Sequence, residues 1–523
     1  ILDLKHKVKI FGFHFASLDI RQDSRIHKQV FDEIFSHPKI RDYVVGLPKN
    51  FSQLDVQSRH QVLTSVKGDV PVDIFESTIT KETLGSIRAM RKIQELNGER
   101  GCNRYIISNC QTIDNLLELF ALHKICNWDR PSVDIIPLFE TIPDLKVCEE
   151  IMNSLYNNDE YRKHLTTRGD KQTVMLGFSD GTKDGGYFMA NWSIYKAKEY
   201  LTSLSKKYGI NIAFFDGRGG PPARGGGNTH EFYASMGNKI QADDIQLTVQ
   251  GQTISSNFGT NDSCQYNLEQ LLSSGIHNQV FNSERNVLSD ENRETMNKLA
   301  LKSHSAYQNF KAHPEFLLYL EQMTTLKYYA KANIGSRPSK RGSSKKLNFS
   351  DLRAIPFVGS WSQSKQNVPG FFGVGTALQD FDQDGEFKKV IKLYQQSSFF
   401  RTLIANSMMS LTKSFFGLTA YMKNDKRFGD FWTLIHDEYK LTKEMILKLT
   451  GFDELMESEP AGRASIKMRE EIVQPLLTIQ QHALITILNN NDEGNMSDEI
   501  KSLYEKMVTR SLFGNINASR NSA

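Results

Sequence analysis

Charged residues stand at the carboxyl ends of several short apolar runs in this sequence. Arg21, Glu140, Asp180 and Arg218 each come at such an end, and Arg353 lies within a further run. A charge beside buried backbone is costly unless it pairs, holds a metal or binds a ligand. Taken alone, each indicates a salt-bridged or solvated strand end. Five of them at one edge of a sheet would indicate a site for an anion and a cation.

Glu140 and Asp180 offer the hard carboxylate oxygens that Mg²⁺ and Mn²⁺ prefer. Such ions commonly take one or two carboxylates and complete their coordination with water and substrate oxygens. The alternative is that each carboxylate accepts hydrogen bonds from neighbouring loop amides. The residues themselves leave both interpretations open.

The segment 214–227 (FFDGRGGPPARGGG) is the most unusual in the chain. Its small residues would let backbone amides approach an anion, and Arg218 and Arg224 offer forked donors that match phosphate or carboxylate. It has neither the spacing of a Walker loop nor that of a GxGxxG fingerprint. A flexible loop is one alternative. An RNA-contacting RGG segment is another, but a single copy directly after a buried run argues against it.

Two further loops carry basic residues. Residues 179–186 (SDGTKDGG) place Lys183 close to Asp180, and a lysine is a compact cation suited to a small anion. Residues 337–341 (RPSKR), with Lys345 and Lys346 close behind, could form a lid over an anionic substrate. In both cases a solvated surface loop is the alternative. The scattered histidines show no metal-binding spacing and are interpreted as structural.

The elements that must position these residues follow from the apolar pattern. Short, near-continuously apolar runs predict strands buried on both faces, and longer amphipathic stretches such as 112–125 and 191–208 predict helices between them. This alternation indicates parallel strands joined by crossover helices. The predicted strands are Gly12–Ile20, Arg104–Ser108, Val133–Phe139, Thr173–Phe178, Ile210–Phe215, Ile245–Val249 and, after a helical insertion over 267–332, Leu352–Pro356.

Seven predicted strands are one short of the eight that close a parallel barrel. A doubly wound sheet accepts seven, but its Gly-rich turn normally follows the first strand, whereas here it follows the fifth. We therefore predict an α/β, predominantly helical fold: a (β/α)8-type barrel whose first strand lies upstream of Ile1, plus extensive additional helices. The chain, which starts without Met, is accordingly expected to be part of a longer protein.

The pattern also predicts four regions. Residues 1–260 hold the barrel strands and helices, 261–336 a helical insertion, 337–380 the basic loop, last barrel strand and active-site loops, and 381–523 a helical C-terminal region. Linkers are predicted at 337–350 and 489–495. The helices predicted for the C-terminal region are Lys389–Met409, Leu411–Met422, Phe428–Thr450 and Ser465–Leu488.

Composition narrows the function classes. The 523 residues carry a net charge of only +4, so the overall charge does not indicate a nucleic-acid-binding protein. No apolar run approaches the roughly 18 residues that span a bilayer, which argues against a membrane protein. The spacing of the cysteines fits neither a disulfide framework nor a CxxC metal pair, which favours reduced thiols and a cytoplasmic protein. These cysteines are Cys102, Cys110, Cys126, Cys148 and Cys264.

Several longer motifs together resemble phosphoenolpyruvate carboxylase of the bacterial and plant type. The resemblance spans essentially the whole chain. It implies a carboxy-lyase that fixes carbon by joining phosphoenolpyruvate and bicarbonate into oxaloacetate and phosphate, through carboxyphosphate and a metal-stabilised enolate. The motifs are LDIRQDS (18–24), IIPLFET (135–141), MLGFSDGTKDGG (175–186), FFDGRGGPPARGGG (214–227), IGSRPSKR (334–341), LRAIP…GVGTAL (352–378) and ASRNSA (518–523).

The resemblance also assigns roles. Glu140 and Asp180 would hold Mg²⁺ or Mn²⁺, and Leu138 and Met175 would line the pocket around the substrate methylene. The phosphate of phosphoenolpyruvate would lie against Arg21, Arg218 and Arg353. The catalytic residues Lys183 and Arg224 would face bicarbonate, with Arg337 helping to hold the active loop. An acidic effector, aspartate or malate, would bind Lys413, Arg469, Asn521 and the shared Arg224. The family further implies a homotetramer, with no nucleic-acid or membrane partner.

Three departures from the family pattern stand out. The TAHPTE-type motif with its catalytic histidine occurs nowhere in the chain, so we expect this chain to be inactive alone. Asp216 stands where the family usually has His. Segment 248–259 lacks the usual charged residues, with Val249, Gln252, Ser255 and Asn257 in their places. The alternatives are a non-catalytic scaffold or effector-binding relative, and an RNA-binding role for the basic loops.

Overall fold

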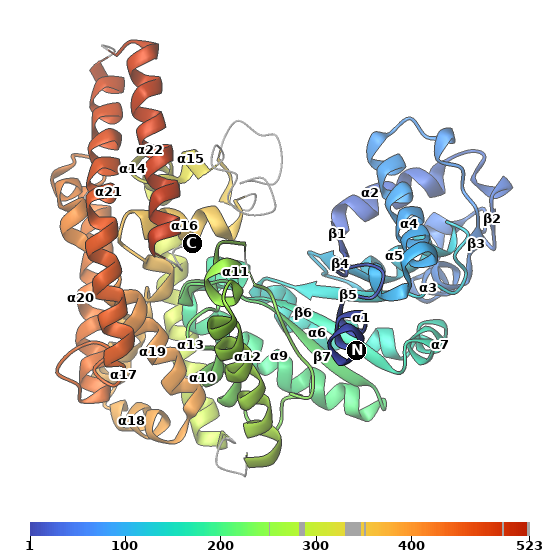
Figure 1. Ribbon diagram of the computed structural model, residues 1–523, viewed down its shortest axis with the longest axis horizontal. Coiled ribbons are helices and arrows are strands. Elements are labelled where there is room, and N and C mark those ends of the chain that lie inside the picture. The colour runs from blue at the N-terminus through green and yellow to red at the C-terminus, as the bar shows by residue number, and fades with distance from the viewer. Residues whose placement is uncertain (250, 282–287, 330–346, 350–351, 494–495, 520–523) are drawn as a thin grey trace. The chain divides into compact units, whose positions relative to one another are not determined.

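The computed structural model describes residues 1–249, 251–281, 288–329, 347–349, 352–493 and 496–519, and Figure 1 traces them from blue to red. The chain forms two compact units, which are described separately. Unit 1 comprises residues 1–176, 197–215 and 244–246, and unit 2 comprises 177–196, 216–243 and 247–523. The chain therefore crosses between units near the carboxyl ends of three strands. The four regions predicted from the sequence stay predictions.

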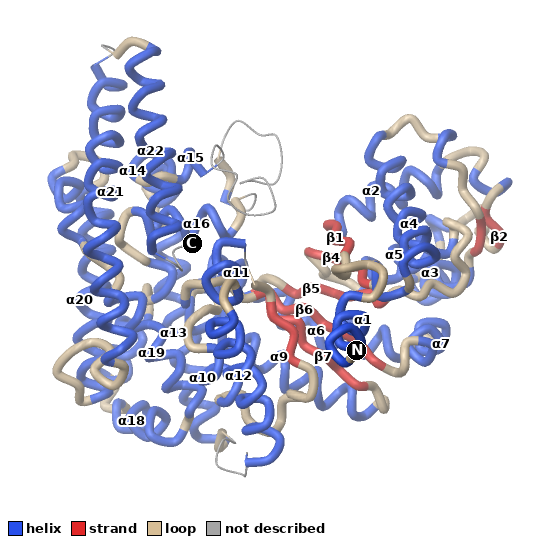
Figure 2. The backbone as a smooth tube through the Cα atoms, in the orientation of Figure 1, coloured by secondary structure: helices blue, strands red, loops and turns tan. Residues whose placement is uncertain are grey.

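The chain contains a six-stranded sheet, whose strands are among those drawn in red in Figure 2. Its spatial order is β1-β4-β5-β6-β7-β8, and the pairings of β1 with β4, β4 with β5 and β5 with β6 are parallel. Sequential strands are thus spatial neighbours, which is the order of a singly wound sheet and not of a doubly wound one. The strands are β1 (Asp19–Asp23), β4 (Arg104–Ser108), β5 (Asp134–Phe139), β6 (Lys171–Gly177), β7 (Asn211–Gly217) and β8 (Ile245–Leu247).

The prediction of an α/β, predominantly helical protein with parallel strands is confirmed. Five of the predicted strands are present within a few residues of their expected bounds, because near-continuous apolar runs such as 104–108 are buried along almost their whole length. Closure into a barrel of eight strands stays a prediction.

Two predicted strands are wrong in position or kind. The run 12–20 becomes a strand only from Asp19, since Gly12 has φ +50° and the side chains of Phe13 and Phe15 are 92% and 80% exposed. The run 352–356 enters a helix at Ala354, with Arg353 as its N-cap. Pro356 is tolerated there because the first-turn amides of a helix have no intrahelical acceptor.

Helices cover the sheet in unit 1 and join its strands. One of them, α2 (Ser24–Ser36), packs on both α4 (Thr78–Asn97) and α5 (Ile113–Lys124). The helix predicted over 112–125 is therefore confirmed. The remaining elements are α1 (Leu2–Phe11), β2 (Val44–Val45), α3 (Val56–Ser65), β3 (Lys67–Gly68), α6 (Ile142–Tyr156), α7 (Asp159–Thr167) and the carboxyl half of α9 (Tyr187–Lys207).

Unit 2 is almost entirely helical, and an aromatic cluster forms its core. The Phe310 ring stacks on Phe372 and on Phe431, with centroid distances of 4.1 and 5.2 Å. Its helices are α8 (Phe178–Gly185), α10 (Thr229–Ala234), α11 (Gly251–Phe258), α12 (Asn261–Ile276), α13 (Asp290–Lys311), α14 (Phe316–Met323), α15 (Leu326–Tyr329), α16 (Ala354–Gln363), α17 (Val374–Gln383), α18 (Phe387–Gln396), α19 (Ser398–Thr412), α20 (Gly429–Thr450), α21 (Pro460–Glu493) and α22 (Asp498–Ser519).

Two helices and one linker predicted for the C-terminal region need correction. The single helix expected over 389–409 breaks at Ser397, whose side chain accepts the Phe400 amide and caps α19. The helix expected over 411–422 is instead the end of α19 and a 3₁₀ segment, Phe416–Asn424. The linker expected at 489–495 is helical up to Glu493. The other predicted linker lies mostly outside the described residues.

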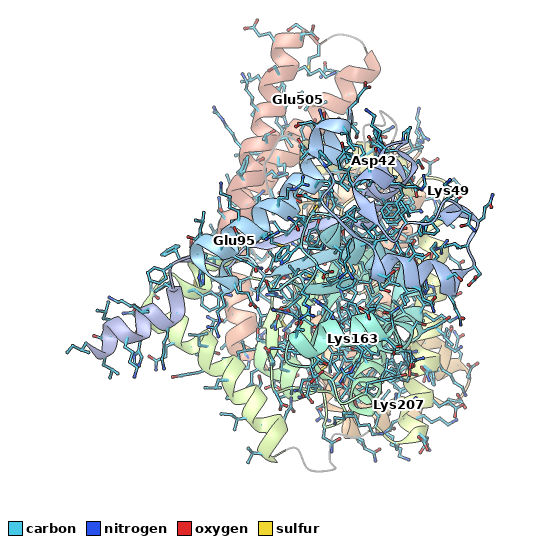
Figure 3. The ribbon with its side chains drawn as sticks, turned by 90° about the vertical axis from the view of Figure 1, so that its right-hand side faces the viewer. Asp42, Lys49, Glu95, Lys163, Lys207 and Glu505 are labelled. Atoms are coloured by element: carbon cyan, nitrogen blue, oxygen red, sulfur yellow. The ribbon has the colours of Figure 1, made fainter. Side chains whose placement is uncertain are left out.

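Charged side chains such as Glu95, Lys163 and Lys207 project from the helices of unit 1 into solvent (Figure 3). Among the described helices, none combines the length and the apolar character needed to cross a membrane.

The buried histidines of unit 1 predict acid sensitivity. Burial lowers the pKa of His27 and His164 to about 3 and that of His123 to about 4. The unfolded chain takes up these protons near pH 6.5 whereas the folded chain does not, so stability is complete above that pH and falls as the pH drops toward 4. At pH 5 we expect each of these histidines to lower the free energy of unfolding by about 2 kcal/mol relative to its value above pH 6.5.

Urea unfolding followed between pH 5 and 8 measures this effect. The slope of the free energy of unfolding against pH gives the number of protons taken up on unfolding. This number should fall by about one in His123→Gln, and the exposed control His6→Gln should keep the parent slope. An unchanged slope in His123→Gln would contradict the assignment.

Candidate active site

Two of the residues singled out in unit 1, Arg21 on β1 and Glu140 directly after β5, bind each other. Nη2 of Arg21 donates to Oε1 of Glu140 at 3.2 Å, and the Asn109 amide donates to Oε2, also at 3.2 Å. Glu140 is 4% exposed. This buried carboxylate is therefore oriented by one donor on each of its oxygens.

Leu138 and Met175 are neighbours across two strands. They are register partners on β5 and β6, both are buried, and they share an apolar cluster with Ile106, Ile136 and the partly buried Phe215. The structure thus brings together the two side chains expected to line an apolar wall of the site.

In unit 2, Arg224 lies close to the first turn of α8. Its Nε donates to Oγ of Ser179 at 3.1 Å, while burial lowers the pKa of the guanidinium to about 10 against the opposing attraction of Asp180. Among the described residues, Nη1 of Arg224 has no acceptor. The buried Arg224 guanidinium therefore lies within the electrostatic influence of the partly buried Asp180.

Lys183, on α8, is held against the segment that precedes α16. Its Nζ donates to the carbonyl oxygens of Leu352 and Phe349, the latter at 3.1 Å, and lies 4.9 Å from the centre of the Phe349 ring. Lys183 is only 8% exposed. These bonds place its ammonium next to the backbone of Arg353, so the two predicted cations lie on adjoining segments.

The Gly-rich loop after β7 is folded on itself. The amides of Gly219, Gly225 and Gly226 donate to carbonyl oxygens of Arg224, Pro222 and Pro221. A Cβ at Gly226 would lie 1.8 Å from the carbonyl oxygen of Gly220, so no larger residue fits there. The small residues therefore serve the close folding of the loop, and these three amides are already used inside it.

Arg218 begins this loop and lines a cavity. Its Nε donates to the carbonyl oxygen of Gly225, and its guanidinium carbon lies 4.0 Å from the centre of the Phe232 ring. Nη2 is buried and has no acceptor among the described residues. The adjoining cavity has a volume of about 380 Å³, and Arg218 is its single charged lining residue in the described part of the chain. An unused guanidinium donor at a polar cavity is suited to an anion.

Two of the altered positions line the same cavity as Arg218. Val249 and Asn257 form part of its wall, together with Thr248 and Gln270. Apart from Arg218, the described lining is neutral. Two of the departures from the family pattern noted in segment 248–259 therefore lie beside a residue expected to bind substrate.

A second pocket of unit 2 brings together two residues expected to bind an effector. Lys413 and Arg469 line it with Lys365 and Glu470, which form an ion pair, and with Pro221 of the Gly-rich loop. Burial lowers the pKa of Lys413 to about 8, aided by Lys365 and Arg469 and opposed by Glu470. Three cations against one carboxylate give the pocket an excess positive charge.

Arg337 and Asn521, also predicted for the site, lie outside the described residues. Glu140 belongs to unit 1 and Asp180 to unit 2, so each is described only within its own unit. Within the described ranges, no group of three or more His, Cys, Asp or Glu side chains is gathered as a metal site. The two carboxylates nevertheless have the hard-oxygen chemistry that a divalent ion requires.

Sequence reasoning missed Tyr233 and the ion pair of Lys365 with Glu470. Tyr233 lies on the short helix α10 and its hydroxyl donates to Oδ2 of Asp216 at 2.8 Å. No sequence signal separates such a tyrosine from an ordinary core aromatic. Lys365 stands in the polar stretch 360–367 (SWSQSKQN), where a lysine gives no sequence signal of its own.

Comparison with known proteins matches the chain to one family. The pattern of the phosphoenolpyruvate carboxylase family matches residues 1–519. The phosphoenolpyruvate carboxylase of Nitrosomonas eutropha is 33% identical over 523 residues, which cover 96% of this chain and 55% of that protein. The chain thus spans about half the length of the relative, and the resemblance noted in the motifs is confirmed.

The pocket around Lys413 predicts pH-dependent anion binding. Lys413 loses its proton as the pH rises through about 8, so a dicarboxylate should bind more tightly at pH 7 than at pH 9. We expect malate affinity, measured by calorimetry, to fall about five- to tenfold across that range. Lys413→Met should weaken binding at pH 7 and remove the pH dependence, while Lys443→Met on the exposed face of α20 should change neither.

Proposed function

Because the chain belongs to the phosphoenolpyruvate carboxylase family, we propose that the protein it forms joins phosphoenolpyruvate and bicarbonate into oxaloacetate and phosphate. A bicarbonate oxygen attacks phosphorus and the bond from phosphorus to the enol oxygen breaks, giving carboxyphosphate and the enolate of pyruvate. Carboxyphosphate then releases CO₂ and phosphate, and carbon 3 of the enolate attacks CO₂. The observation that carries the proposal is the family match over residues 1–519, which includes every described residue given a role below.

Phosphate binding is assigned to Arg218, Arg21 and Arg353. Arg218 supports this role best, since the residue lines a polar cavity and its buried Nη2 has no acceptor among the described residues. Arg21 is already oriented by Glu140. Guanidinium groups that are preorganised before the substrate binds stabilise the charge that develops on the transferred phosphoryl oxygens.

Bicarbonate is assigned to Lys183 and Arg224. Lys183 donates two of its three ammonium protons to backbone carbonyls, which fixes the position of the charge. Arg224 is fixed by Ser179 and keeps Nη1 without an acceptor in the described residues. Two fixed cations would hold the nucleophile in line with phosphorus and would reduce its charge repulsion with the phosphate.

Mg²⁺ or Mn²⁺ is assigned to Glu140 and Asp180. When bound, the ion would supply positive charge for the enolate oxygen. Arg21 and the Asn109 amide orient the Glu140 carboxylate from behind, as partners of metal ligands commonly do. Leu138 and Met175 would exclude water from the carbon that must meet CO₂.

The proposal extends to the barrel, the effector, the cellular location and the oligomeric state. The sequential order of the sheet supports a (β/α)8 barrel that needs strands beyond those described here. The excess charge around Lys413 supports an acidic effector, aspartate or malate. The free cysteines support a cytoplasmic protein, and the family supports a homotetramer and a chain that is inactive without the remainder of its length.

The second candidate is a non-catalytic, effector-binding relative. Asp216 favours it, because this buried carboxylate lies two residues from Arg218 where the family usually has a histidine. Such a protein would bind a dicarboxylate in the Lys413 pocket and would release no phosphate.

Metal binding provides one test. Glu140→Ala combined with Asp180→Ala should abolish Mn²⁺ binding measured by calorimetry, since the ion keeps no protein carboxylate. The control Glu118→Gln changes a buried carboxylate that pairs with Lys28 elsewhere in unit 1, and it should bind Mn²⁺ as the parent does. Equal metal affinity in the double variant would show that the ligand pair is wrong.

Turnover provides the other test. Phosphate release from phosphoenolpyruvate should depend on bicarbonate in the whole protein, and Arg218→Gln should lower its rate at least about a hundredfold. Oxaloacetate measured in the same assay confirms that carbon was transferred. A whole protein that binds malate but releases no phosphate would favour the non-catalytic relative.

A further inference from the structure

Asp216 is the last residue but one of β7, and Arg218 directly follows the strand. Both are buried, with exposures of 1% and 5%. A carboxylate and a guanidinium placed in this way would ordinarily form a bidentate ion pair. Such a pair would use the donors of Arg218 that the proposed function needs for phosphate.

A tyrosine hydroxyl lies between these two charges. The hydroxyl of Tyr233 donates to Oδ2 of Asp216 at 2.8 Å, and the guanidinium carbon of Arg218 lies 5.3 Å from the centre of the Tyr233 ring. Burial raises the pKa of Tyr233 well above its ordinary value. Asp216 raises it further while Arg218 lowers it, as expected for a hydroxyl near both groups.

The surrounding contacts fix this arrangement. The Phe232 ring supports the guanidinium of Arg218 at 4.0 Å, and Nε of Arg218 donates to the carbonyl oxygen of Gly225. The side chain of Asn278 donates to the carbonyl oxygen of Tyr233 at 2.5 Å, so the backbone of Tyr233 is held independently of its hydroxyl. Arg218 is thus supported by a ring and a carbonyl. The residue lines the cavity, and its buried Nη2 has no acceptor among the described residues.

We propose that Tyr233 is a positioning residue that holds the Asp216 carboxylate, so that Arg218 keeps a free donor for an anionic phosphate group in the adjoining cavity. The inference rests on the proposed function in taking phosphate as the ligand. It explains how a chain with aspartate at the position usually occupied by histidine keeps an anion-binding guanidinium two residues away.

Phosphate binding to the full chain tests the proposal without any turnover. In Tyr233→Phe, Asp216 loses a donor and turns to Arg218, so calorimetry with inorganic phosphate should show affinity about tenfold lower. Asp216→Asn in the same background removes the competing charge and should restore the affinity to within about twofold of the parent. This rescue is not expected if Tyr233 only supports the local packing.

Three controls complete the test. Arg218→Gln should abolish phosphate binding, which shows that calorimetry reports on this cavity. Tyr161→Phe removes another buried hydroxyl, one that donates to the neutral Gln172 at 3.0 Å, and should leave the affinity unchanged. If Tyr233→Phe alone does not fold, the comparison of Asp216→Asn with the double variant replaces it, and the two should bind phosphate equally.

The outcomes separate this inference from the proposed function. Parent-like affinity in Tyr233→Phe, no rescue by Asp216→Asn, or phosphate binding that survives Arg218→Gln would each overturn the inference. If the predicted binding pattern is found but the whole protein forms no oxaloacetate, the proposed function fails and the inference stands.

Discussion

Charge buried at the carboxyl ends of parallel strands must be balanced within a few ångströms, because a buried ion without a partner is strongly destabilising. This chain balances such charges in small groups. Arg21 and Glu140 neutralise each other in unit 1, and Asp180 attracts the buried guanidinium of Arg224 in unit 2. Asp216 is held by Tyr233. The arrangement of the site follows from how each group solves this electrostatic problem.

Balancing these charges leaves some arginine hydrogen-bond donors without an acceptor among the described residues. Arg218 and Arg224 each make a hydrogen bond through Nε and keep a terminal nitrogen without an acceptor in the described residues. A guanidinium fixed at one edge and open at the other costs little further ordering when an anion arrives. Phosphoryl transfer depends most on electrostatic stabilisation of the transition state by preorganised groups.

Much of the fold could be predicted from the sequence because burial on both faces leaves a near-continuous apolar signal, as in 104–108 and 134–139. The prediction failed where local chemistry decides the conformation: at Gly12, at the N-cap Arg353, and at Ser397, which divides a helix. For the site, residue type and position identified Arg218 and Glu140. Tyr233 could not be found in this way, because its importance depends on a contact between α10 and the end of β7 that no spacing in the sequence encodes.

The crowding at Gly226 has a consequence for how this protein can vary through time. Every single-nucleotide change that replaces this glycine adds at least a Cβ, which would lie 1.8 Å from the carbonyl oxygen of Gly220. Gly85, on α4, has no neighbouring atom within 4 Å of the same position and is free to drift to alanine. In a collection of naturally occurring variants, Gly226 would remain invariant while Gly85 diversified, and the difference would reflect backbone geometry alone.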